Sequence, residues 1–180
     1  MNERVVCDFS GRVLSLRHQL TAEAVDLAID ALLRLDTKGV RPIHIYLGCR
    51  GGTIAEAVSL IDIAVAIQSP IEITMLGLVQ GTALWMLLAA KRRRALPGTL
   101  IATDGVWSSS GTIGLGRSAA DEAMANAMVE HLRYFGERMR PDLLAILDEA
   151  RRTPRIYRAK EALEIGLIDS IEGQGRKGKP

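Results

Sequence analysis

Two places in this 180-residue chain offer candidate nucleophiles. Cys49 stands beside a glycine-rich turn, and consecutive serines lie at Ser108–Ser110, with glycines at Gly105 and Gly111 on either side. A serine or thiol nucleophile needs an adjacent base, but no histidine or lysine lies near the serines in the sequence. We therefore interpret Ser108–Ser110 as a polar loop and Cys49 as a buried, unreactive thiol.

Ligands for a metal ion or a phosphate are not grouped in the sequence either. His44 falls in a strand pattern and His131 in a helical pattern, and neither has a second ligand residue at a metal-binding spacing. No glycine pattern has the strand and helix context of a phosphate-binding loop. We predict no metal, no nucleotide and no other cofactor.

Two glycine-rich turns repeat one structural unit. The β-rich run Ile43–Leu47 leads to a turn that ends at Gly52, and the run Ile71–Leu76 leads to a turn that ends at Gly81. A helical pattern follows each turn, over Thr82–Ala90 in the second case. Repeated strand, turn and helix units predict an α/β fold around a mostly parallel sheet, with both turns at the same sheet edge.

The remaining elements follow from apolar periodicity and capping signals. We interpret the basic run Lys91–Arg94 as the solvated end of the preceding helix, where cations complement the helix dipole, rather than as a binding patch for an acidic partner. The other expected elements are strands at Val5–Phe9, within Ala95–Thr103 and at Leu167–Ile171, and helices from Thr21 to about Asp36, from Thr53, from about Ala119 to Met139, over Pro141–Ala150 and over Ala159–Ile165.

Composition limits the class of protein. The chain has 48% hydrophobic residues and a net charge of only +2, which gives no strong basic field for nucleic acid. The longest apolar stretch, Met75–Ala90, is interrupted by polar residues and glycines, and two cysteines are too few for a disulfide framework. We expect a cytoplasmic protein that binds neither membrane nor nucleic acid, with a single domain over residues 1–172 and a flexible basic tail over 173–180.

Several segments, taken in order, resemble one known family. They are Glu3–Gly11, Ile43–Tyr46 with Gly51-Gly52, the turn Gly77–Ala83, Leu96-Pro97, Ala159–Ala162 and Gly166–Ser170. Together they resemble the Clp peptidases, the ClpP-like serine proteases of peptidase family S14, which assemble as stacked heptameric rings beneath an unfoldase. The resemblance covers nearly the whole chain. It implies a ClpP/crotonase-type spiral of strand-turn-helix units with a protruding handle helix.

The catalytic residues of that family are not retained. The resemblance implies that the positions of its serine, histidine and aspartate fall on Gly81, Asp104 and Pro154. Glycine has no side chain to form an acyl-enzyme, and proline offers neither a side-chain acceptor nor a backbone N–H. The segment between Gly81 and Pro97 is about two residues shorter than is usual in the family. No neighbouring alignment brings a histidine to the site, because all three histidines lie in other elements.

The backbone part of the site is retained on the same alignment. The N–H groups of Gly52 and Thr82 stand where the family has its oxyanion hole, the pair of donors that stabilises a developing negative charge. The alternative is that the glycines serve turn geometry alone, and it is the one we favour. In the family, the region Gly105–Met139 forms the handle that joins two rings. The stripe Met124, Met128, Leu132 and Phe135 would then face a partner or its own domain.

Two functions follow from these observations. The first is a pseudoenzyme, a structural or regulatory subunit of a ring-shaped peptidase, assembled with itself or with an active ClpP-like paralogue. Docking of a Clp ATPase would be weakened, because the chain begins almost at the family's first strand. The alternative is an active hydrolase or acyl- or thioester-handling enzyme, which uses the retained backbone donors with Asp104 or another acid as its base.

Overall fold

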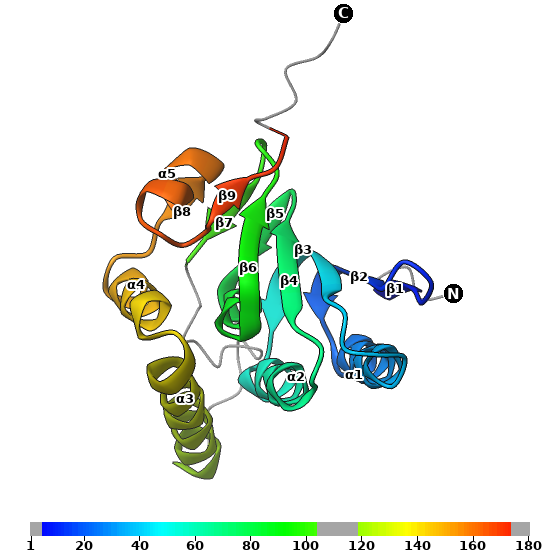
Figure 1. Ribbon diagram of the computed structural model, residues 1–180. Coiled ribbons are helices and arrows are strands. Elements are labelled where there is room, and N and C mark those ends of the chain that lie inside the picture. Colours follow the sequence, from blue (N-terminus) through cyan, green and yellow to red (C-terminus); the bar gives the residue numbers. More distant parts are fainter. Residues whose placement is uncertain (1–4, 104–118, 174–180) are drawn as a thin grey trace, which may run out of the picture.

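The computed structural model describes residues 5–103 and 119–173 and shows an α/β fold with two sheets (Figure 1). The larger sheet has six strands in the order β1-β2-β3-β4-β6-β9, and the smaller has the order β5-β7-β8. The strands are β1 (Val5–Asp8), β2 (Val13–Leu20), β3 (Ile43–Gly52), β4 (Ile71–Met75), β5 (Leu78–Gln80), β6 (Ala90–Ala95), β7 (Leu100–Ala102), β8 (Ile156–Arg158) and β9 (Ser170–Ile171). The helices are α1 (Ala22–Asp36), α2 (Ile54–Ala66), the 3₁₀ helix η1 (Gly81–Ala89), α3 (Ala119–Met139), α4 (Pro141–Arg152) and α5 (Ala159–Glu164).

The larger sheet is parallel except at one edge. β2, β3, β4, β6 and β9 run parallel to one another, whereas β1 pairs with β2 in the antiparallel sense. Helices α1 and α2 connect successive parallel strands, as the repeated strand, turn and helix pattern predicted. In the smaller sheet, β5 and β7 are parallel and β8 is antiparallel to β7.

Alternation along β3 shows how the core forms. Ile43, Ile45 and Leu47 are completely buried, while the intervening residues are only partly covered. Helix α1 packs its apolar stripe, which includes Leu32 and Leu35, into the same core. Among the described residues, no helix is long and apolar enough to cross a bilayer.

The predicted helix starts are confirmed at their caps. The Thr21 hydroxyl accepts a hydrogen bond from Ala24 N–H at 3.3 Å and begins α1. Thr53 begins α2 with a capping box, in which Glu56 accepts a hydrogen bond from Thr53 N–H at 3.0 Å. Gly166, with φ of +78°, follows the end of α5, as predicted.

The interpretation of Lys91–Arg94 as a helix end is wrong. These residues form most of β6, between β4 and β9 in the larger sheet. Alternation explains the placement, because Arg93 is buried while Arg92 on the opposite side is exposed. The four consecutive basic residues hid the strand pattern from the sequence, because the inward-facing Arg93 is charged and pairs with a specific acidic residue.

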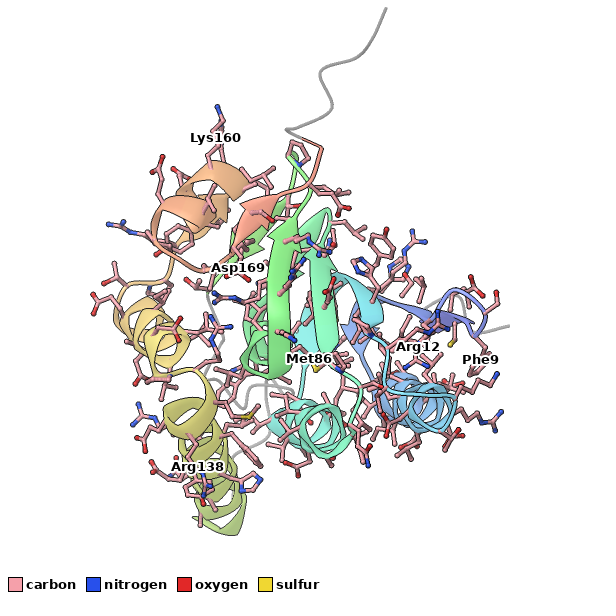
Figure 2. The ribbon with its side chains drawn as sticks, in the orientation of Figure 1. Phe9, Arg12, Met86, Arg138, Lys160 and Asp169 are labelled. Carbon is pink, nitrogen blue, oxygen red and sulfur yellow. The ribbon has the colours of Figure 1, made fainter. Side chains whose placement is uncertain are left out.

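That partner is Asp169, which precedes β9 (Figure 2). Arg93 Nη2 lies 2.6 Å from Asp169 Oδ1, and Arg93 N–H donates to Asp169 Oδ2 at 2.7 Å. Burial alone would raise the pKa of Asp169, but the hydrogen bonds from Arg93 and the charges of Arg93 and Arg140 outweigh it, and the net shift is downward. The ionised carboxylate therefore stabilises the pairing of β6 with β9.

This lowered pKa predicts a pH-dependent stability. A carboxyl group with a depressed folded-state pKa contributes stability above its unfolded pKa of about 4 and loses it as the pH falls through the folded value. Asp169→Asn should lower the free energy of unfolding by about 1–2 kcal/mol at pH 7, allowing for the partial exposure of the carboxylate. Urea denaturation should show the difference from wild type shrinking below about pH 4.

The matched control is Asp26→Asn, which changes an exposed acid on α1. It should leave stability at pH 7 within about 0.5 kcal/mol of wild type. An Asp169→Asn effect that stayed constant from pH 7 to pH 3 would show that the charge of Asp169 does not stabilise the strand pair.

Candidate functional site

Gly81 and Pro154, the positions that the resemblance assigns to the nucleophile and the acid, lie near the same end of the smaller sheet. Gln80, the last residue of β5, pairs with Ala102 of β7, and Ala102 in turn pairs with Ile156 of β8. Gly81 directly follows Gln80, so it stands at the end of β5 next to the end of β7, and the start of β8 lies on the far side of β7. The strand pairing therefore brings together segments that are far apart in the chain.

Thr103 and Arg155 extend the pairing of β7 with β8 by one residue. Thr103 N–H donates to the Arg155 carbonyl oxygen at 2.9 Å, and Arg155 N–H donates to Thr103 Oγ1 at 3.0 Å. Pro154 is exposed next to Arg155. Asp104 follows Thr103 in the sequence and lies outside the described residues, as do Ser108–Ser110.

Gly81 occupies a sharp turn from strand to helix. It is buried, has φ of +61° and is the first residue of η1. In hydrolases, a nucleophile at such a turn is held in a strained conformation that presents its side chain to the substrate. Here the turn conformation is present, but the residue is the one that adopts it without strain and without a side chain.

The glycines at the end of β3 lie very close to neighbouring backbone. A Cβ atom on Gly52 would lie 2.0 Å from the Leu20 carbonyl oxygen, and one on Gly51 would lie 2.8 Å from Thr82 Oγ1. Gly51 also has φ of +82°. Both positions thus require glycine for steric reasons that are independent of catalysis.

The Thr82 hydroxyl binds the Gly52 N–H, one of the two backbone donors that the sequence placed at an oxyanion hole. Gly52 N–H donates to Thr82 Oγ1 at 2.8 Å, and the same hydroxyl donates to the Gly52 carbonyl oxygen at 3.0 Å. Thr82 is only 3% exposed. The expectation from the sequence concerned the backbone N–H of Thr82 and not its hydroxyl, although a threonine at the start of a helix is a common hydrogen-bonding signal.

Cys49 is buried, as predicted. The residue is completely buried, and its Sγ accepts a hydrogen bond from Gly51 N–H at 3.4 Å. Burial raises the pKa of the Cys49 thiol and so disfavours the reactive thiolate. Burial, with a contribution from the charge of Asp8, likewise raises the pKa of Cys7.

His44 and His131 make their contacts elsewhere in the fold, whereas His18 on β2 lies opposite Cys49 of β3. His131 Nε2 on α3 lies 3.2 Å from Asp62 Oδ1 on α2, and His44 packs against Tyr46 on β3. Within residues 5–103 and 119–173, no three histidine, cysteine, aspartate or glutamate side chains are grouped as metal ligands. On the predicted α3 stripe, Leu132 is buried and Phe135 half-buried, while the side chains of Met124 and Met128 lie outside the described part.

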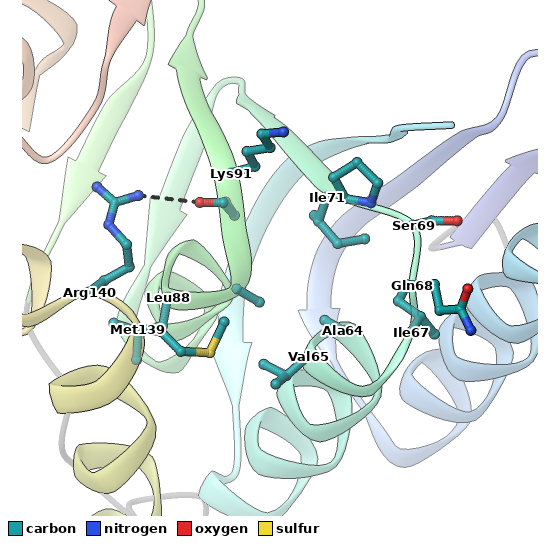
Figure 3. Close-up of a pocket in the computed structure, with 13 residues that line it drawn as sticks. Ala64, Val65, Ile67, Gln68, Ser69, Ile71, Leu88, Lys91, Met139 and Arg140 are labelled. Carbon is teal, nitrogen blue, oxygen red and sulfur yellow. Dashed lines mark hydrogen bonds between the residues drawn. The ribbon is translucent and has the colours of Figure 1, made fainter. Parts of the chain in front are cut away.

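A hollow of about 400 Å³ lies at the other end of η1 (Figure 3). Its walls come from the ends of α2 and η1, the starts of β4 and β6, and the junction of α3 with α4. Arg140 at its rim donates to the Ala90 carbonyl oxygen at 3.3 Å, and the Ser69 hydroxyl in its lining donates to Asp36 at 2.7 Å. These polar groups are engaged in structural contacts, and the lining holds no pair of nucleophile and base.

The close approach at Gly52 predicts that even a methyl group is not tolerated there. Gly52→Ala should destabilise the fold by about 3 kcal/mol or more, because the added Cβ must displace the Leu20 carbonyl. Gly98→Ala is the matched control, since a Cβ there meets nothing within 4 Å, and it should change stability by less than about 0.5 kcal/mol. Urea denaturation of both variants measures the difference, and equal stability would contradict the observed packing.

Comparisons with known proteins agree with the arrangement of strands and turns. A sequence model of the Clp protease family matches residues 6–175. The chain is 26% identical over 167 residues to ATP-dependent Clp protease proteolytic subunit 2 of Thermobifida fusca (strain YX), covering 89% of this chain and 80% of that protein. It is 25% identical over 176 residues to ATP-dependent Clp protease proteolytic subunit-related protein 2, chloroplastic, of Arabidopsis thaliana, covering 89% of this chain and 58% of that protein.

A solved structure has the same fold. The ClpP protease catalytic domain from Plasmodium falciparum superimposes with a TM-score of 0.73 at 23% identity, covering 92% of this chain and 88% of that chain. The α/β fold expected from the sequence is therefore confirmed. With the family model matching almost the whole chain, the conclusion is that this chain belongs to the Clp protease family.

Proposed function

We propose that this chain is a pseudoenzyme, a structural or regulatory subunit of a ring-shaped ClpP-like peptidase. The observation that carries the proposal is Gly81, which holds the nucleophile turn at φ of +61° without a side chain. No acyl-enzyme can form at a residue that lacks a hydroxyl or thiol. Exposed Pro154 supports the same conclusion, since it has no group that could orient a histidine.

The proposed partners are further copies of this chain or an active ClpP-like paralogue. Helix α3 supports this assignment, because it projects away from the sheets in Figure 1 and carries the exposed Tyr134 and Met139. Exposed aromatic and methionine side chains are enriched at protein interfaces. We assign α3 to the contact between rings, and a Clp ATPase is a further proposed partner of the complete assembly.

The first test asks whether the chain carries any activated serine. The purified protein is treated with a fluorophosphonate serine-hydrolase probe and its intact mass is measured, with an active Clp peptidase as the positive control. We expect no adduct on this chain. One stoichiometric adduct would contradict the proposal, because it would reveal an active serine elsewhere in the chain.

The second test restores the nucleophile alone. Gly81→Ser should give no measurable hydrolysis of a fluorogenic peptide above wild type, because Pro154 cannot orient a base and the left-handed backbone conformation disfavours a side chain by about 1–2 kcal/mol. Thermal denaturation controls for folding of the variant. Hydrolysis regained by this single change would mean that the assignment of Asp104 or Pro154 is wrong.

The third test addresses assembly. Native mass spectrometry of the chain alone, and of the chain refolded or co-expressed with an active ClpP-like peptidase, should detect homo- or hetero-oligomeric rings. Tyr134→Ala on α3 should weaken association between rings, whereas Tyr157→Ala, which changes a half-buried residue in the smaller sheet, serves as a control for a general loss of stability. A chain that stays monomeric under all these conditions would exclude the structural role.

The alternative, an active hydrolase with Asp104 as its base, needs free donors for an oxyanion. The hydrogen bond from Gly52 N–H to the Thr82 hydroxyl weighs against it. Asp104→Ala separates the two proposals, since it should abolish any turnover that depends on this base. A rate unchanged by the substitution would remove Asp104 from the mechanism.

A further inference from the structure

The hydroxyl of Thr82 bonds to both ends of one residue. Its Oγ1 accepts from Gly52 N–H at 2.8 Å and donates to the Gly52 carbonyl oxygen at 3.0 Å. A hydroxyl group has one donor and two acceptor sites, so this arrangement uses it in both senses. The contact joins the end of β3 to the first turn of η1, thirty residues further along the chain.

The contact lies where the family resemblance places the donors of an oxyanion hole. Thr82 lies in the first turn of η1, where backbone N–H groups have no partner within the helix and the helix dipole favours negative charge. Gly52 N–H points at the same place, because it reaches Thr82 Oγ1. A substrate acyl oxygen or a carboxylate would need the position that the Thr82 hydroxyl fills.

We propose that Thr82 closes this site, its hydroxyl standing as an internal ligand in place of an acyl or carboxylate oxygen on the Gly52 N–H. The proposal deepens the proposed function, because it gives a reason beyond the missing triad for the lack of activity. It does not depend on assembly into rings. Its consequence is that wild-type protein does not bind carboxylates at this turn, whereas Thr82→Ala protein, which lacks the hydroxyl and leaves its space empty, does.

Packing makes the internal ligand hard to displace. Thr82 is 3% exposed, and a Cβ atom on Gly51 would lie 2.8 Å from its Oγ1, so the hydroxyl has no free space on that side. A β-branched side chain also has few rotamers. An intramolecular group held in place has already lost the translational freedom that a free carboxylate would lose on binding. Free carboxylates therefore cannot compete with it at ordinary concentrations.

The test is hydrogen–deuterium exchange of the Gly52 amide, resolved to single residues by fragmentation mass spectrometry. In wild-type protein we expect the amide to exchange at least tenfold more slowly than the amide of exposed Gly98. Thr82→Ser retains the hydroxyl and should keep the amide protected. Thr82→Ala and Thr82→Val both remove it and should raise the exchange rate at least tenfold.

Chemical rescue separates a ligand-like hydroxyl from a merely structural one. Thr82→Ala leaves space at the donor, so sodium acetate should restore slow exchange at Gly52, and sodium chloride at equal ionic strength should not. Acetate should have no effect in wild type, nor in Thr82→Val, whose side chain still fills the space. Lost structure alone would give a rate that acetate does not change, and that result would overturn the proposal.

Two measurements keep the proposal testable if a variant fails to fold. Fast exchange of Gly52 in wild-type protein would overturn it without any substitution, and so would fast exchange in a folded Thr82→Ser variant. The outcome is also distinct from that of the proposed function. A fluorophosphonate adduct would exclude the pseudoenzyme while leaving the protection of the Gly52 amide unchanged. An unprotected Gly52 amide would overturn the closure of the site by Thr82, but Gly81 would still lack a nucleophile.

Discussion

The close approach of three segments at Gly52 organises the part of the fold that carries the site. The Leu20 carbonyl at the end of β2, the backbone of Gly52 at the end of β3 and the Thr82 hydroxyl at the start of η1 meet within hydrogen-bonding or van der Waals distance. Because η1 begins here, the orientation of Gly81 is fixed by the same contacts. The geometry of a hydrolase turn is thus maintained by packing that needs no catalytic side chain.

A buried arginine holds the opposite edge of the larger sheet. Arg12 is 3% exposed and donates to the Leu35 and Arg41 carbonyl oxygens and to Ser69 Oγ at 2.6, 2.8 and 2.9 Å. Asp36 accepts hydrogen bonds from the backbone and hydroxyl of Ser69, and these bonds help to lower the pKa of the Asp36 carboxyl. The loops after α1 and α2 are therefore joined to the start of β2, and a buried cation is satisfied by carbonyl oxygens rather than by one ion pair.

The sequence predicted the helix ends that are determined by neighbouring residues in the chain. Threonine caps gave the starts of α1 and α2, and Gly166 gave the end of α5. Strand β2 was not predicted, because its inward residues Leu14 and Leu16 alternate with polar ones over a short distance and its far end is irregular, with His18 at φ of +71°. Strand β8 was also missed, since three residues after a proline carry almost no pattern.

Other parts of the site depended on long-range contacts that no spacing reveals. Arg93 is buried because it pairs with Asp169, 76 residues away. This pairing allows the basic residues Lys91–Arg94 to form a strand inside the sheet. The resemblance assigned Gly81 and Pro154 to one site. The pairing of β5 with β7 and the pairing of Thr103 with Arg155 bring the segments around these residues near each other. Thr82 was named for its backbone, and its side chain was overlooked because the target, Gly52, is thirty residues earlier in the chain.

Helix η1 shows how a short segment spans the length of its sheet. It is a nine-residue 3₁₀ helix whose first eight residues are buried. A 3₁₀ helix rises about 2.0 Å per residue against about 1.5 Å in an α-helix, so nine residues cover about the length of twelve α-helical ones. Stretching η1 lets β6 begin at Ala90 in register with β4 while Gly81 stays beside Gln80. A 3₁₀ helix of this length has poorer hydrogen-bond geometry than an α-helix. Its burial offsets that cost, so the packing of η1 and the Thr82–Gly52 hydrogen bonds together hold the turn at Gly81.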